Sequence, residues 1–245
     1  MPLEPLPAIR PGDDLAGLIA AAAPGDLASG DVVVVAHKVV SKAEGRIRRL
    51  GEIEPGERAR GLAEEHGKDA RLVQAVLDES DEVLRAAGGT LICVTHHGFV
   101  CANAGVDRSN ASEAADELML LPEDPDRSAR LLRNGLEASR GVRPAVVIAD
   151  SFGRAWRLGQ TDVAIGAAGV VPLDQWIGRP DGFGRELRVT SIAVADSIAA
   201  AADLARAKDS LEPAVLVRGL DRFVTADDGP GAAALRRSRE DDLFR

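Results

Sequence analysis

The chain of 245 residues contains few aromatic side chains. They make up 3% of the sequence, with no tyrosine and only two tryptophans, Trp156 and Trp176. Proteins that bind single-stranded nucleic acid stack the bases on aromatic side chains, so this composition disfavours that class. The net charge of −9 would also repel a phosphate backbone unless a local basic patch overcame it. We therefore expect no nucleic-acid partner, and any anionic ligand should be small or neutralised by a metal ion.

Cysteines and long apolar segments are also scarce. Cys93 and Cys101 lack the Cys-x-x-Cys spacing of many metal and redox sites, and no signal peptide precedes them. We expect both to be reduced core residues. No stretch approaches 18 uncharged apolar residues, and the N-terminus carries Glu4, Asp13 and Asp14 in place of a signal sequence. These features predict a cytoplasmic protein that does not associate with membranes.

Three common site motifs are missing from the sequence. It contains no G-x-x-x-x-G-K-[ST] loop, no G-x-G-x-x-G fingerprint and no G-x-S-x-G elbow. If the protein binds a nucleotide, it must hold the phosphates in a less familiar way.

The rest of the sequence is typical of a folded protein, with 45% hydrophobic and 28% charged residues. Predicted strands alternate with predicted helices, and Leu91–Val100 resembles a hairpin that turns at His97 and Gly98. We expect an α/β fold, more exactly a mixed α+β arrangement. The strands are predicted at 32–36, 145–149, 187–193 and 214–217, and the helices at 13–23, 57–65, 70–79, 125–139 and 194–208.

Polar residues follow two of the predicted strands. Asp107 and Asn110 come after the hairpin, and Asp150 and Ser151 come directly after residues 145–149, where we expect a loop. Carboxylate oxygens suit Mg²⁺ or Mn²⁺, which often also contact substrate phosphates. The alternative is that both aspartates only cap turns.

Other polar stretches allow two interpretations each. Lys38, Lys42 and Arg46 follow a buried strand and could meet anionic oxygens, or they could form a solvated basic face. The segment Gly159-Gln160-Thr161-Asp162 could let a ligand approach the backbone, or it could be a tight turn before a packed strand.

Two long blocks in this sequence resemble those of the coenzyme F-420 gamma-glutamyl ligases. They are Ala-Asn-Ala-Gly-Val-Asp-x-Ser-Asn at 102–110 and Asp-Ser-Phe-Gly-Arg-Ala-Trp-Arg…Gly-Gln-Thr-Asp at 150–162, and the resemblance extends from Leu6 to Gly219. It implies a two-lobed mixed sheet with flanking helices in an intertwined homodimer. It also implies GTP-dependent addition of L-glutamate to F-420-0, and of a second glutamate through a gamma linkage, by way of an acyl phosphate that is formed as GDP leaves. Phosphate is released when the amide forms.

The resemblance assigns roles position by position. Asp107 and Asp150 fall on metal positions and are the catalytic candidates, and Ser151 falls on a second metal position where threonine is more usual. Mn²⁺ or Mg²⁺ is the implied ion, with K⁺ as a further candidate. The implied GTP-binding residues are Leu6, Pro7, Ala8, Ile9, His37 (where serine is common), Lys42, Asn110, Arg206, Ala207, Lys208, Asp209, Ser210 and Leu211.

We expect residues 1–245 to form a single ligase unit. Some relatives carry a further nitroreductase-like domain, for which this chain is too short, so we expect no reductase activity. Two other functions stay open: a non-catalytic deazaflavin- or nucleotide-binding module, and a metal-dependent phosphohydrolase. Both explain the carboxylates, but neither accounts for Asn110 and the Gly159–Asp162 segment.

Overall fold

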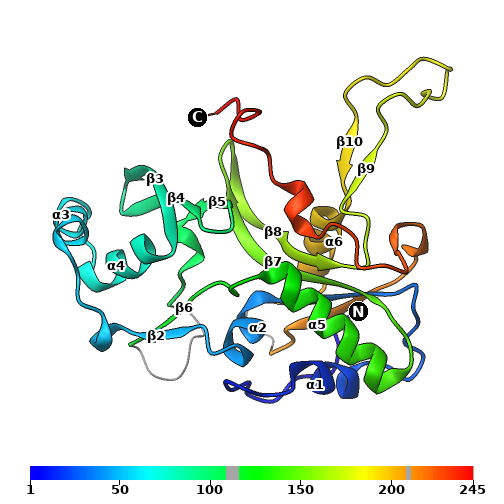
Figure 1. Ribbon diagram of the computed structural model, residues 1–245, viewed down its shortest axis with the longest axis horizontal. Coiled ribbons are helices and arrows are strands. Elements are labelled where there is room, and N and C mark those ends of the chain that lie inside the picture. Colours follow the sequence, from blue (N-terminus) through cyan, green and yellow to red (C-terminus); the bar gives the residue numbers. More distant parts are fainter. Residues whose placement is uncertain (109–115, 208–210, 245) are drawn as a thin grey trace.

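The computed structural model describes residues 1–108, 116–207 and 211–244. Its central sheet has the strand order β11-β1-β7-β8 (Figure 1). β1 (Val32–Ala36) runs parallel to β7 (Ala145–Arg154) and antiparallel to β11 (Ala214–Val217), and β8 (Arg157–Ala168) forms a long hairpin with β7. Because β1 and β7 are parallel, their carboxyl ends point toward the same edge of the sheet.

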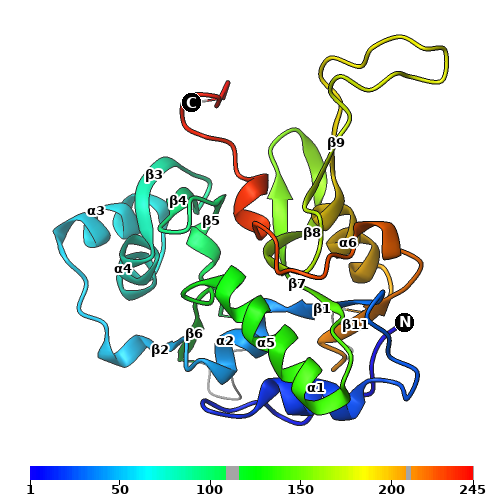
Figure 2. The ribbon, with the colours of Figure 1, turned by 45° about the vertical axis from the view of Figure 1, so that its right-hand side comes forward.

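Helices cover both faces of this sheet, which explains the uninterrupted valines of β1. Val33 and Val35 lie in the core cluster beneath α1 (Leu15–Ala22) and α5 (Pro125–Arg140). Val32 and Val34 lie in the opposite cluster, with α6 (Val194–Asp203). A strand that is buried on both faces needs apolar residues at every position. Figure 2 shows α5 and α6 on either side of the sheet.

Capping residues mark the ends of two helices. The side chain of Asp14 accepts a hydrogen bond from the backbone of Gly17 at the start of α1. Asp124 caps α5 in the same way through Arg127, and Gly141 ends that helix in the left-handed region at φ 68°.

A separate hydrophobic cluster forms around the antiparallel sheet β3-β4-β5. In Figure 1 it lies on the left, with α3 and α4 beside the sheet. Cys93 and Cys101 face each other across β4 and β5 as free, buried thiols, which confirms the expected core role. The bounds are α3 (Glu57–His66), α4 (Ala70–Asp78), β3 (Ser80–Ala87), β4 (Thr90–Thr95) and β5 (Val100–Ala102).

The remaining elements of the structure are short. β2 (Ile47–Arg49) pairs with β6 (Glu117–Met119), and the short 3₁₀ turns are Leu50–Glu52, Asn103–Gly105, Asp221–Phe223 and Ala232–Leu235. β9 (Leu173–Gln175) and β10 (Ser191–Ala193) begin and end an arm that projects from the rest of the structure in Figures 1 and 2. Within the described ranges, no helix is long and apolar enough to cross a membrane.

The mixed α/β class is confirmed, but four local predictions are wrong. The polar segment 37–46, which we expected to form a binding loop that carries Lys38, Lys42 and Arg46 after the buried strand, begins with a helix, α2 (His37–Ala43). The predicted loop after residue 149 is strand, because β7 continues beyond the end of β1 and stays paired with β8. The strand predicted at 187–193 is limited to β10, and the helix predicted at 194–208 ends at Asp203.

Candidate functional site

The first two residues of α2 contact the two candidate aspartates. The Nε2 atom of His37 lies 3.2 Å from Oδ1 of Asp150, and Nζ of Lys38 lies 2.6 Å from Oδ2 of Asp107. Since α2 begins directly where β1 ends, both contacts form at the carboxyl end of β1. Adjacent residues of one helix therefore bring Asp107 and Asp150 to the same edge of the central sheet.

Backbone pairing fixes the position of Asp107. Its N–H donates to the carbonyl of Met119 at 3.0 Å, and the N–H of Met119 donates back at 2.8 Å. Upstream, Cys101 lies in β5, and burial together with the nearby charge of Asp150 raises the pKa of its thiol to about 12. The chain thus passes close to Asp150 before it reaches Asp107.

Positive charge accompanies the two carboxylates. Lys38 and Lys42 are four residues apart on α2, so they lie on the same side of the helix. Burial lowers the pKa of Lys42, the charge of Lys38 lowers it further, and Glu117 opposes the change. Two neighbouring ammonium groups are most favourable when an anion lies between them. The site therefore suits a polyphosphate with bound cations.

A second polar cluster lies within the β7–β8 hairpin and is joined by a residue that follows α6. Ser151 and Asp162 are directly opposite each other in the hairpin, and the Ser151 hydroxyl donates to Oδ1 of Asp162 at 2.6 Å. Arg206 donates to Oδ2 of the same carboxylate at 2.5 Å. Successive side chains of a strand point to opposite faces, so Ser151 and Asp150 face opposite sides of the sheet.

Asp162 was not among the predicted site residues, although it lies in the predicted loop Gly159–Asp162. The signal was present in the sequence: a hairpin over residues 150–162 places a serine opposite an aspartate. The assumption of a loop concealed it, because a loop defines no cross-strand partner.

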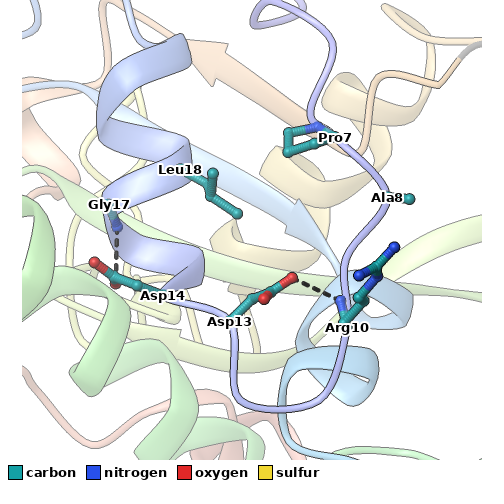
Figure 3. Close-up of a pocket in the computed structure, with 7 residues that line it drawn as sticks. All are labelled: Pro7, Ala8, Arg10, Asp13, Asp14, Gly17 and Leu18. Carbon is teal, nitrogen blue, oxygen red and sulfur yellow. Dashed lines mark hydrogen bonds between the residues drawn. The ribbon is translucent and has the colours of Figure 1, made fainter.

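The predicted GTP-binding residues near the N-terminus divide into two groups. Leu6 and Ile9 pack against the core, whereas Pro7 and Ala8 are exposed and line a pocket of about 420 Å³ (Figure 3). The remaining lining residues are Arg10, Asp13, Asp14, Gly17 and Leu18.

The carboxylates of this pocket already accept hydrogen bonds from backbone N–H groups. Asp13 accepts from the N–H of Arg10 at 2.7 Å, and Asp14 accepts from Gly17 at 3.0 Å, as the dashed lines in Figure 3 show. Two carboxylates would repel a triphosphate that was not neutralised by cations. Lys38 and Lys42 would offer such a ligand a more favourable environment than this pocket. The loop over the pocket still lies close to α2, because the N–H of Gly12 donates to the carbonyl of Ala43.

Other predicted residues have different surroundings. His37 is buried and faces Asp150 and Ser41. Arg206 faces Asp162 and the carbonyl of Pro213, while Ala207 and Leu211 are exposed. Arg46 donates to Glu79 and to the carbonyl of Leu121, which indicates a structural role. Asn110, Lys208, Asp209 and Ser210 lie outside the described residues.

The donor set suits one particular mode of metal binding. In the part of the chain that the structure describes, no three His, Cys, Asp or Glu side chains gather into a cage for an ion. Mg²⁺ is commonly held by only one or two carboxylates together with substrate phosphates and water. Asp107 and Asp150 fit this mode, provided that Lys38 releases Asp107 when the ion binds.

The fold and the site define a class of protein. Polar residues at the carboxyl ends of adjacent parallel strands are typical of α/β proteins that bind a small ligand at the sheet edge. The sequence model of one family, described as F420-0:Gamma-glutamyl ligase, matches residues 5–219. The chain belongs to this family, so the resemblance in the sequence blocks is confirmed.

Several proteins are similar to this chain over nearly its whole length. A coenzyme F420:L-glutamate ligase of Methanopyrus kandleri is 47% identical, over 99% of this chain and 97% of that protein. The protein of the same description from Archaeoglobus fulgidus is also 47% identical, over 100% of this chain and 95% of its own length. That from Methanothermobacter thermautotrophicus is 43% identical, over 99% and 97%.

Proposed function

We propose that this protein is a GTP-dependent ligase that joins L-glutamate to F-420-0 and then adds a second glutamate through the gamma-carboxyl of the first. The observation that carries the proposal is the joint placement of Asp107 and Asp150 by Lys38 and His37, in a chain of the ligase family. An amide cannot form readily from a free carboxylate, which is a poor electrophile. The carboxylate must first be activated.

The proposed reaction has two steps. The acceptor carboxylate oxygen attacks the gamma-phosphorus of GTP, which forms an acyl phosphate and releases GDP. The glutamate amine then attacks the acyl carbon, the C–O bond to phosphate breaks, and the nitrogen loses a proton. Lys38 and Lys42 would bind the phosphates, and Asp107 and Asp150 would hold Mn²⁺ or Mg²⁺, with K⁺ as a further candidate. Such ions neutralise phosphate charge during the transfer.

The test is to incubate the protein with F-420-0, L-glutamate, GTP and Mn²⁺ and to follow product mass. We expect products heavier by one and then two glutamyl units. Asp150→Ala should abolish this gain and leave the circular dichroism spectrum unchanged. Asp26→Ala, which removes an exposed partner of Arg218 on the surface, is the control and should stay active.

Other outcomes would support a different function. Phosphate release that needs neither glutamate nor F-420-0 would point to a metal-dependent phosphohydrolase. Nucleotide or deazaflavin binding in calorimetry without any turnover would point to a binding module. Either result, with a folded protein saturated with Mn²⁺, contradicts the ligase.

We also propose a two-lobed, intertwined homodimer. The arm between β9 and β10 carries apolar side chains that are largely exposed in one chain, among them Ile177, Phe183 and Val189. Exposed apolar residues on a projecting arm favour burial against a second copy. The free thiols of Cys93 and Cys101 favour a reducing compartment, and we propose the cytoplasm.

A further inference from the structure

Ser151, Asp162 and Arg206 form side-chain hydrogen bonds that strand pairing alone does not require. Asp162 is 1% exposed, and each of its carboxylate oxygens accepts a hydrogen bond from a side chain outside β8. Ser151 comes from β7, whereas Arg206 follows α6. Burying a carboxylate is costly unless it is paired and hydrogen-bonded. Ser151 and Arg206 therefore offset the cost of burying Asp162.

The hydrogen bond from Ser151 to Asp162 fixes where the proton of the hydroxyl points. A hydroxyl has one proton and two lone pairs, and a carboxylate that faces a guanidinium acts as an acceptor. The proton of Ser151 therefore points at Asp162, and its oxygen can meet any further group only through the lone pairs. A hydroxyl that contacts a cation needs this same orientation.

We propose that Asp162 is a positioning residue, which orients the Ser151 hydroxyl for a divalent cation on the α6 side of the sheet edge. Arg206 keeps the carboxylate of Asp162 from turning toward that cation, because the guanidinium holds its second oxygen. This assignment rests on the proposed function and on the family resemblance, which implies an ion position at Ser151 distinct from that of Asp150. The opposite orientation of the two side chains agrees with two positions.

The arrangement also changes the role of Arg206. The sequence placed it in a nucleotide-binding stretch, but the structure turns its side chain, which is 11% exposed, toward Asp162 and Pro213. Arg206 therefore acts on the ion through Asp162. Groups that orient metal ligands commonly change metal affinity by about 10- to 100-fold when they are mutated.

The test measures Mn²⁺ affinity by electron paramagnetic resonance in the presence of GDP, with no turnover involved. We expect Asp162→Asn and Ser151→Ala each to weaken Mn²⁺ binding at the affected position by about 10- to 100-fold. Ser151→Thr keeps the hydroxyl and should retain the affinity. In the Ser151→Ala background, Asp162→Asn should have no further effect beyond about twofold, the usual error of additivity.

Controls separate positioning from general stability. Asp228→Asn breaks another buried-arginine ion pair, with Arg133, and should lower the melting temperature without changing Mn²⁺ affinity. If Asp162→Asn fails to fold, the double variant Asp162→Asn/Arg206→Gln removes both charges and should still bind Mn²⁺ weakly.

Two results would overturn the inference. The first is an unchanged Mn²⁺ affinity in folded Asp162→Asn, and the second is an effect that multiplies with that of Ser151→Ala. Both leave the ligase proposal intact if the wild-type chain binds Mn²⁺ and adds glutamate. Absence of Mn²⁺ binding by the wild type would instead contradict both proposals.

Discussion

The side chains of the site are held by partners that lie on neighbouring elements of the fold. Asp107 depends on Lys38, Asp150 on His37, and Ser151 on Asp162. His37 is especially constrained, since its side chain is 3% exposed and both ring nitrogens lie near acceptors. The imidazole of His37 therefore serves to hold Asp150 rather than to meet solvent.

Lys42 leads to a prediction on pH. Its pKa is lowered, chiefly by burial, so it loses its positive charge at a lower pH than an ordinary lysine. If Lys42 binds the phosphates of GTP, nucleotide affinity should fall as the pH rises through that lowered pKa. Lys42→Arg should keep its affinity at alkaline pH, because arginine stays charged.

The measurement is GTP affinity by calorimetry as a function of pH in the wild type and Lys42→Arg. Lys68 provides the control, because burial also lowers its pKa while its ammonium group binds Asn103. Lys68→Arg should follow the wild-type profile. Identical profiles for the wild type and Lys42→Arg would remove Lys42 from the phosphate contacts.

At the scale of elements, the sequence predicts those helices and strands that carry strong local signals. The valines of β1 were informative, and the caps of α1 and α5 and Gly141 are signals of the same kind, because each acts within a few residues. The extension of β7 through Asp150 was not predictable in this way. Its polar residues suggest a loop, and only pairing with β8 keeps them in a strand.

Two glycines in helices should respond in opposite ways to replacement by alanine. Around Gly61 in α3, an added Cβ atom meets nothing within 4 Å, so Gly61→Ala should stabilise the protein by up to about 1 kcal/mol through helix propensity. At Gly135 in α5, the same atom would overlap the Cβ of Ala16. Overpacking costs about 1 to 3 kcal/mol and should outweigh that gain.

Urea unfolding followed by circular dichroism would measure both changes. The two variants have the same chemistry and helical context, so each serves as the control for the other. A stabilised Gly135→Ala variant would show that α1 and α5 are not packed as closely as described.

At the scale of the whole molecule, the sequence indicated the mixed α/β class but not the contacts that assemble the site. Lys38 was one of three basic residues, with Lys42 and Arg46, that could equally have formed a solvated face. Its contact with Asp107 depends on how the β3-β4-β5 sheet and its helices lie against α2 and β7. Such long-range placement leaves no local pattern in a single sequence, whereas the two family blocks pointed to both aspartates directly.

The proposed homodimer depends on the arm between β9 and β10. Phe183 is 93% exposed and Val189 is 87% exposed on the arm between β9 and β10. Replacement of both by aspartate should yield a monomer in analytical ultracentrifugation, because two charges would be forced into an apolar interface. Leu131→Asp, at an exposed position of α5, should leave the assembly unchanged. A wild-type monomer would contradict the proposal.

In the proposed mechanism, Asp107 and Asp150 jointly bind divalent cations together with the phosphates of a guanine nucleotide. The most direct measurement is anomalous diffraction from crystals of the protein grown with Mn²⁺ and GDP. We expect manganese peaks at the carboxylates of both residues, with the phosphates beside Lys38 and Lys42. Manganese and GDP bound elsewhere, with Lys38 still paired to Asp107, would contradict this mechanism.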